Sequence, residues 1–162
     1  MKMRKNNFKI SLAVNELIKS EYKIAIKIIE QVIGEMGFKF NFETYDKDLF
    51  DIDKYYPKPE GNFWIGKLDN DYAGTIALRP TTKEYCELKR FYVLYNYRGK
   101  GLGKLLIDKC LKYTKYQGHR EIRLDTNPSN KSAIYIFKKR GFIEIDRYWN
   151  APPGQLFMSL KF

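Results

Sequence analysis

The segment 98–104, with the sequence RGKGLGK, constrains the fold more than any other part of the chain. It follows a run typical of a strand, 84–94, and leads directly into a helical pattern. Alternating glycines let the main chain turn its N–H groups inward, and a helix start adds the positive end of its dipole. Because Arg98, Lys100 and Lys104 surround the loop with positive charge, we predict a site for an anion such as a pyrophosphate.

Two common phosphate-binding loops do not fit this segment. A Walker A loop ends in Gly-Lys-Ser/Thr, whereas Leu105 follows Lys104 here. A dinucleotide-binding loop needs a glycine where Lys104 stands. The remaining alternative is a glycine-rich turn with incidental basic residues.

The rest of the chain alternates between strand and helix patterns. Helical spacing predicts a helix over 22–36 with Asn15 as a candidate cap, and 41–60 predicts a connection containing a short helix. Within 62–80, two strands are predicted on either side of a turn at 69–71. Further strands are predicted at 8–14, 84–94, 121–126, 142–149 and 155–162. Two further helices are predicted, one from 101 and one over 128–140. This order predicts one α/β or α+β domain over 1–162, with helices packed on a mixed sheet.

Composition excludes several classes of protein. The 162 residues carry a formal net charge of +11, which suggests an anionic partner. The lysines are scattered along the chain, however, and this favours a solvated charged surface over a dedicated face for nucleic acid. The N-terminal segment has no apolar stretch behind its charges, and no run approaches the roughly 18 apolar residues of a membrane span. We expect a cytoplasmic protein that neither crosses a membrane nor requires nucleic acid.

The cysteines and the histidine give no sign of a metal site. Cys86 and Cys110 are far apart in the sequence and lack metal-ligand spacing, so reduced thiols are expected. His119 stands alone in a polar turn, where it would have to recruit every partner of a zinc site or a Ser-His-Asp triad. We therefore predict no metal.

Two motifs resemble the GNAT superfamily of N-acetyltransferases. Within 87–106, ELKRFYVLYNYRGKGLGKLL, the family signature Gln/Arg-x-x-Gly-x-Gly/Ala is matched by Arg98, Gly101 and Gly103. Within 130–142, NKSAIYIFKKRGF, the family's Asn-x-x-Ala…Gly-Phe helix is matched at Asn130, Ala133, Gly141 and Phe142. The resemblance extends over about 8–162. It implies a mostly antiparallel sheet of six to seven strands flanked by about four helices.

The resemblance also implies how acetyl-CoA is held. The loop amides would bind its pyrophosphate, and the backbone of the preceding strand would pair with the pantetheine arm and supply an oxyanion hole. Asn130 would contact the arm through its side chain, and Phe137 would pack against it or in the core. The implied residues are Phe91, Tyr92, Val93, Arg98, Gly99, Lys100, Gly101, Leu102, Gly103, Lys104, Asn130 and Phe137.

Acetyl transfer to an amine needs a base, because a lysine-like amine with a pKa of about 10.4 is mostly protonated at pH 7. Glu87 is the candidate, since it matches the catalytic glutamate of the family's histone-modifying branch. A glutamate facing solvent or paired with Lys89 or Arg90 is the alternative, and a water chain ending on Asp125 is another route.

The family's general-acid tyrosine is replaced by Phe137, so another group must assist the departing thiolate. Tyr92, Tyr148 and water are the candidates, with Tyr148 taken as the catalytic choice. A thiol with a pKa of about 8.5 leaves tolerably without an acid.

The acceptor site is expected opposite the donor, between 41–60 and the C-terminal strands. The candidate lining aromatics are Tyr55, Tyr56, Trp64, Tyr148 and Trp149. Arg90 is the candidate clamp for a substrate carboxylate, which favours an amino acid or a similar small acid. A protein terminus or lysine as acceptor, a non-catalytic CoA-binding or nucleic-acid-binding module, and a homodimer all stay open.

Overall fold

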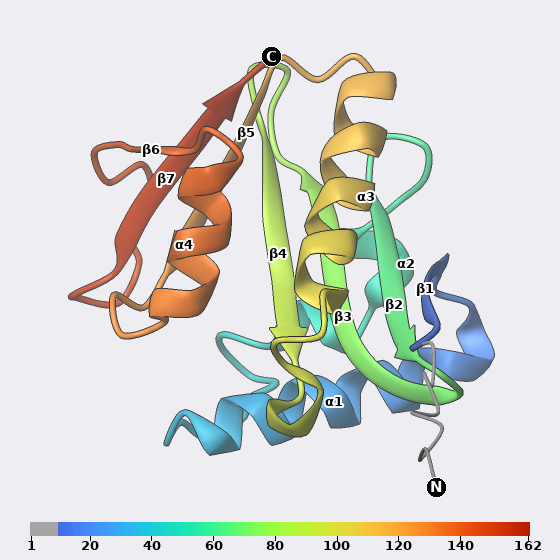
Figure 1. The fold of residues 1–162 in the computed structure, drawn as a ribbon. Coiled ribbons are helices and arrows are strands. Elements are labelled where there is room, and N and C mark those ends of the chain that lie inside the picture. Colours follow the sequence, from blue (N-terminus) through green and yellow to red (C-terminus); the bar gives the residue numbers. More distant parts are fainter. Residues whose placement is uncertain (1–9) are drawn as a thin grey trace, which may run out of the picture.

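The fold is built on one mixed β-sheet in the computed structural model, which describes residues 10–162. Its strands are β1 (Leu12–Glu16), β2 (Asn62–Leu68), β3 (Asp71–Pro80), β4 (Cys86–Val93), β5 (Glu121–Thr126), β6 (Ile143–Glu144) and β7 (Leu156–Lys161). They lie in the order β1-β2-β3-β4-β5-β7-β6 (Figure 1). All neighbours are antiparallel except β4 and β5, which run parallel.

Helices cover both faces of this sheet. Within the described residues they are α1 (Tyr22–Glu35), α2 (Ile52–Tyr55), α3 (Leu102–Tyr116) and α4 (Lys131–Lys139). In Figure 1, α3 and α4 lie in front of the sheet, and α1 and α2 lie behind it. The predicted order of elements and the mostly antiparallel, helix-flanked sheet are therefore confirmed.

Two apolar layers hold the helices to the sheet. Because side chains alternate along β2, Phe63 and Ile65 pack with α1 and α2, whereas Trp64 packs with α3. The central strands are thus buried on both faces, as expected of a sheet between two helical layers.

Several predicted boundaries were wrong for identifiable reasons. Part of the strand predicted at 8–14 lies outside the described residues, and β1 continues to Glu16, so Asn15 is in a strand and does not cap a helix. The helix predicted from 101 begins at Leu102, and within it Leu105 is exposed and Ile107 is buried. The strand predicted at 142–149 shrinks to β6, since Arg147 donates hydrogen bonds to the Trp149 and Ala151 carbonyls and stabilises a loop.

Strands β4 and β5 separate soon after they meet (Figure 1). Their register includes only Cys86 with Ile122 and Glu87 with Arg123. Further along, the register of β4 with β3 shifts, and Arg90 adopts a φ of +55° there. The Thr75 hydroxyl donates to the Arg90 carbonyl at 2.8 Å and holds this irregularity. The sheet consequently opens between β4 and β5.

A pair of glycines lets α3 lie close to the sheet beside this opening. Gly66 and Gly74 are opposite each other in β2 and β3. A Cβ on Gly66 would lie 2.9 Å from Leu102 Cδ1, and a Cβ on Gly74 would lie 2.9 Å from Leu106 Cδ1. The leucines of α3 therefore fill the space that two side chains would otherwise occupy.

Gly74→Ala should destabilise the protein, because its Cβ would also lie 2.9 Å from the main-chain oxygen of Tyr92, which cannot move aside cheaply. We expect a loss of about 1–3 kcal/mol in the free energy of unfolding, measured by urea denaturation. Gly34→Ala is the matched control, since a Cβ on this helical glycine meets nothing within 4 Å. It should stabilise the protein by about 0.5–1 kcal/mol, and equal effects of the two changes would contradict this account of α3 packing.

Candidate active site

Two adjoining cavities follow the opening in the sheet. The loop-side cavity, of about 490 Å³, is lined by the glycine loop and the start of α4. The strand-side cavity, of about 480 Å³, lies between β4, β5 and the segment after α1. The residues that line both are Met36, Phe91, Tyr92, Asn130 and Ala133. A molecule that reaches from the glycine loop to the gap between the strands would pass this shared wall.

The glycine loop uses backbone conformations that favour glycine. Gly99 and Gly101 have φ values of +74° and +95°, a backbone conformation that residues other than glycine rarely adopt. Gly101 is the N-cap of α3, and no side chain of the described residues caps it, so the first amides of the helix are available to a ligand. Gly103 lines the loop-side cavity. This is a suitable place for a phosphate group.

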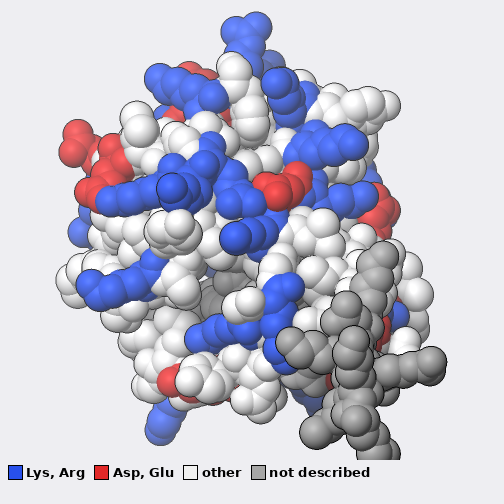
Figure 2. Space-filling model, viewed as in Figure 1, with Lys and Arg blue, Asp and Glu red and all other residues white. Residues whose placement is uncertain are grey.

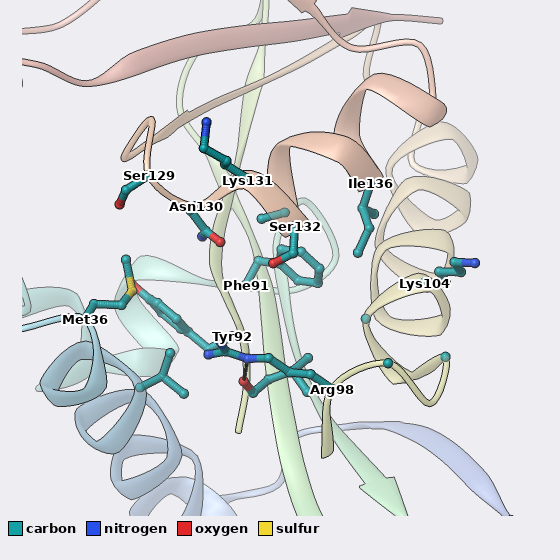
Figure 3. A pocket seen from close by; sticks show the side chains of 16 residues that line it. Met36, Phe91, Tyr92, Arg98, Lys104, Ser129, Asn130, Lys131, Ser132 and Ile136 are labelled. Atoms are coloured by element: carbon teal, nitrogen blue, oxygen red, sulfur yellow. Dashed lines mark hydrogen bonds between the residues drawn. The ribbon is translucent and has the colours of Figure 1, made fainter. Parts of the chain in front are cut away.

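The start of α4 forms the opposite wall of the loop-side cavity. In Figure 3, Asn130 and Ser132 point toward the cavity from this side, whereas Lys131 points away from it. Asn130 was predicted, but Ser129 and Ser132 were missed, as were Val32 and Met36 of the α1 side. The Pro-Ser-Asn run before a helical pattern was the available signal for Ser129, whereas Ser132 lies within the helix and had no such signal.

The predicted donor-binding residues have different surroundings. Arg98 donates from Nε to the Val93 carbonyl at 2.8 Å and so braces the loop against the end of β4 (Figure 3). Lys100 donates to the Asn96 carbonyl at 3.3 Å, and Leu102 is buried in the core. The predicted residues that line the loop-side cavity are Phe91, Tyr92, Val93, Arg98, Gly99, Gly101, Gly103, Lys104 and Asn130. Phe137 lines the strand-side cavity instead.

The charged residues that line the strand-side cavity are Lys39, Asp46, Lys89, Arg90 and Asp125, and among them Lys89 and Asp125 face each other across the gap between the strands. Lys89 of β4 and Asp125 of β5 lie with Nζ and Oδ1 3.5 Å apart. The Trp149 indole donates to the same Asp125 oxygen at 3.3 Å. Leu88 and Leu124 add apolar surface. This arrangement places charge in a largely apolar cavity at the point where the strands diverge.

Arg90, the predicted carboxylate clamp, is engaged within the protein. Its Nε donates to Asp48 at 2.9 Å, and Nη1 donates to Asp46 at 2.7 Å. Its Nη2 donates to the Tyr45 carbonyl at 3.0 Å and also contacts Asp48. All three charged side chains are buried. Arg90 therefore joins β4 to the segment after α1, and its geometry does not support the clamp expected from the sequence.

The same buried network includes Tyr56, the other predicted substrate residue. Its hydroxyl donates to Asp48, and its ring packs edge-on against Phe63. Burial raises the pKa of Asp48, but the hydrogen bond and charge of Arg90 and the bond from Tyr56 outweigh it, so the net pKa lies below 3.8. Burial raises the pKa of Tyr56 well above its usual value. Among the described residues that line the two cavities, Tyr56 is absent.

Glu87 and Tyr148, the predicted catalytic residues, contact each other outside both cavities. The Tyr148 hydroxyl donates to Glu87 at 3.0 Å, and Arg79 Nε donates to the other carboxylate oxygen at 2.9 Å. Burial raises the pKa of Glu87, whereas Lys89, Arg79 and Tyr148 lower it more. Burial also raises the pKa of Tyr148. Neither residue lines the cavities formed by residues 10–162.

Of the aromatic residues expected around the acceptor, Trp149 lines a cavity within the described chain. Trp64 is fully buried between the sheet and α3, and Tyr55 packs with the layer on the α1 face. Large apolar side chains most often serve the core, and the sequence offers no sign that separates these from Trp149.

Comparisons with known proteins agree with this geometry. The family model described as the Acetyltransferase (GNAT) family matches residues 25–142. An uncharacterized N-acetyltransferase of Schizosaccharomyces pombe is 26% identical over 162 residues, covering 98% of each chain. The N-acetylaspartate synthetase of Xenopus tropicalis is 34% identical over 97 residues, covering 59% of this chain and 36% of that protein. The crystal structure of an acetyltransferase of the GNAT family from Staphylococcus aureus superimposes with a TM-score of 0.83 at 26% identity, covering 93% and 99% of the two chains.

The chain therefore belongs to the GNAT family of acetyltransferases. It is an acyltransferase that depends on acetyl-CoA, as the family and the names of its relatives indicate.

The charge of the protein lies mainly on its outside. Figure 2 shows basic side chains scattered over the face that carries α3 and α4, with acidic side chains among them. The exposed lysines of α3 are Lys104, Lys109, Lys112 and Lys115. No helix between residues 10 and 162 is both long and apolar enough to span a membrane.

Arg90→Met should lower the free energy of unfolding by about 3–5 kcal/mol at pH 7, because it leaves Asp46 and Asp48 buried without their cation. In the folded wild type the pKa of Asp48 is depressed, so the ionised Asp48 carboxylate stabilises the fold at pH values above its usual pKa of 3.8. This stabilisation is lost as the pH falls below 3.8. In the variant, only the bond from Tyr56 and the charge of Lys89 still oppose the effect of burial, so the pKa of Asp48 rises relative to wild type and its protonated form is favoured. The difference between wild type and variant should therefore shrink as the pH falls from 7 toward 4, as measured by denaturation at each pH.

Arg140→Met is the control for this measurement. Arg140 donates two 2.9 Å hydrogen bonds to Asp108, whose side chain is 57% exposed. Loss of this surface pair should lower stability by less than about 1 kcal/mol. Equal losses in the two variants, or an Arg90 effect that does not change with pH, would refute the buried network as a major source of stability.

Proposed function

We propose that the protein transfers the acetyl group of acetyl-CoA to the primary amine of a small molecule, by direct attack of the amine. The observation that carries this proposal is the strand-side cavity, of about 480 Å³, with the charged Lys89 and Asp125 inside it. Its volume is typical of a small-molecule site. The name of the N-acetylaspartate synthetase relative adds support for a small amino compound as acceptor.

The residues of the loop-side cavity fit the donor. The amides around Gly99 and Gly101 suit the pyrophosphate, and Lys104 at the cavity wall adds positive charge. Bound acetyl-CoA supplies an activated thioester, so that an N–C bond forms, the C–S bond breaks, the nitrogen loses one proton and the sulfur gains one.

The β4 backbone suits the arm of the donor. Residues 91–93 line the loop-side cavity and lie beyond the last β4–β5 register pair, Glu87 with Arg123. Their main-chain groups on that edge can therefore bond to a ligand instead of a strand. An amide at this place is also suited to stabilise negative charge that develops on a carbonyl oxygen.

Direct attack is favoured over an acetylated enzyme intermediate. Cys86 and Cys110 are fully buried in the core. Burial raises the pKa of Cys86 to about 12 and raises that of Cys110 as well. Neither thiol is therefore accessible or ionised, and both conditions are needed for a cysteine nucleophile.

For the base we favour Asp125 over Glu87. Asp125 lines the strand-side cavity, where it can reach the acceptor amine directly or through water. Glu87 is bound to Arg79, Thr81 and Tyr148, and its lowered pKa makes it a weaker base. We therefore assign Glu87 to a positioning role behind the cavity.

As the general acid that protonates the departing thiolate, we favour Tyr92 over Tyr148. Tyr92 lines both cavities, and burial raises its pKa, so its hydroxyl stays protonated. Tyr148 donates its proton to Glu87 instead.

The purified protein should convert acetyl-CoA and a primary amine into CoA and the N-acetyl product in equal amounts, as measured by mass spectrometry. Gly103→Asp should abolish this transfer, because it places a negative charge in the loop-side cavity. The helix should tolerate the change, since a Cβ there has ordinary 3.5 Å contacts and a carboxylate suits the first turn. CoA at about 100 times its Kd should add about 2.7 kcal/mol to the stability of the wild type but not of the variant.

Gly103→Asn is the matched control, because it has almost the same size without the charge. It should lose less CoA affinity than Gly103→Asp. An equal stabilisation of the wild type by CoA and by ATP, together with no transfer to any amine, would reject the proposed reaction in favour of general polyanion binding.

The choice of base predicts different results for two isosteric changes. Asp125→Asn should lower kcat/KM by about 10²- to 10⁴-fold, because it removes the proposed proton acceptor, while CoA affinity is retained. Glu87→Gln should lower stability, since Arg79 loses its charged partner, and should reduce kcat/KM less. A larger kinetic loss in the Glu87 variant, with the fold intact, would instead identify Glu87 as the base.

A further inference from the structure

We infer that Lys89 and Asp125 recognise an acceptor that carries both an ammonium and a carboxylate group close together, as an α-amino acid does. This inference rests on the proposed function and assigns the acceptor class to two named side chains. Lys89 would bind the carboxylate and Asp125 the ammonium. Both residues line the strand-side cavity, Lys89 from β4 and Asp125 from the neighbouring strand β5.

The topology explains why these two side chains face each other. Glu87 and Arg123 form the last register pair of the parallel strands β4 and β5. Lys89 and Asp125 each lie two residues further along, so they occupy the next position on the same face. The strands no longer pair there, and the space between them belongs to the cavity.

The pair is half-buried and is held less tightly than the buried charges of the Arg90 network. The Lys89–Asp125 distance is 3.5 Å, against 2.9 and 2.7 Å for two of the Arg90 contacts. Within the described residues, both contacts of Asp125 fall on Oδ1, which leaves Oδ2 for a ligand. Lys89 donates in one of these contacts, and an ammonium group has three protons to donate.

A compact amino acid would replace one ion pair by two. Its carboxylate would take over Lys89 and its ammonium would take over Asp125, so the net charge in the cavity stays unchanged. A simple amine would have to compete with Lys89 for Asp125 and would leave the lysine without an anionic partner among the described residues, with only the Trp149 ring 5.9 Å away, in a low-dielectric site. The separation of 3.5 Å also favours amine and carboxylate groups on the same or adjacent carbon atoms.

The same contacts would orient the reaction. Held by Asp125, the amine lies beside the carboxylate proposed to receive its proton. The cavity wall at Phe91 and Tyr92 is shared with the loop-side cavity, which provides the route to the thioester. Recognition and activation of the acceptor would thus use one carboxylate.

The test compares amino acids with amines that lack only the carboxylate: alanine with ethylamine, leucine with isoamylamine, and phenylalanine with phenethylamine. Calorimetry of each probe with the CoA complex measures binding, and kcat/KM measures transfer. The wild type should prefer the amino acid in at least one pair. Lys89→Met should lower that preference by about 10- to 100-fold in both measurements, as expected when a hydrogen bond to a charged group is lost.

Two control variants separate the loss of the carboxylate contact at Lys89 from the effect of a lower net charge and from damage to the fold. Lys112→Met removes one positive charge from the exposed face of α3 and should leave the preference unchanged. Lys89→Arg should restore most of the preference, because a guanidinium also binds a carboxylate. ε-Aminocaproate, in which the two groups are far apart, should bind no better than the simple amines.

The outcomes distinguish this inference from the proposed function. Transfer to amines and amino acids without preference, or equal losses for both members of a pair in Lys89→Met, would overturn the recognition pair alone. Transfer to none of the probes by the wild type would overturn both the recognition pair and the small-amine proposal.

Discussion

The separation of β4 from β5 is the constraint on which the site depends. Parallel strands that stop pairing expose main-chain donors and acceptors, which are costly to leave unsatisfied in a protein interior. Helices α3 and α4 both lie on one face of the sheet, α3 in front of β4 and α4 in front of β7 (Figure 1), and two glycines in β2 and β3 let α3 pack closely. A ligand with amide groups along an extended arm can satisfy the exposed edge, so the gap is part of the binding site.

Adjacent residues of β4 have opposite roles because of this constraint. Arg90 is buried and uses its whole guanidinium to hold the segment after α1 against the strand. Lys89 projects into the cavity and makes one long contact with Asp125. A satisfied buried network rigidifies its surroundings, whereas a loosely paired charge can change partners at small cost. The rigid wall beside the cavity and the exchangeable pair inside it thus come from one short stretch of strand.

The sequence could predict the parts of this site that are local. Glycines at 99 and 101 need positive φ values, and Asn130 stands at the start of a helix that its own sequence specifies. The roles of Arg90 and Lys89 could not be predicted, because they depend on the register shift in β4 and on two aspartates more than 40 positions away. The burial of Tyr56 against Asp48 could not be predicted for the same reason, since it depends on how distant parts of the chain pack together.

The two kinds of charge in this protein act over different distances. The innermost charges of the strand-side cavity are paired, since Lys89 faces Asp125 and Arg90 faces two aspartates. Much of the net charge of +11 lies on exposed residues such as the lysines of α3. A diffuse positive field attracts a polyanionic donor from a distance and is screened by salt, whereas paired charges in a cavity select a neutral zwitterion at contact. High net charge and an acceptor of no net charge are thus compatible in one enzyme.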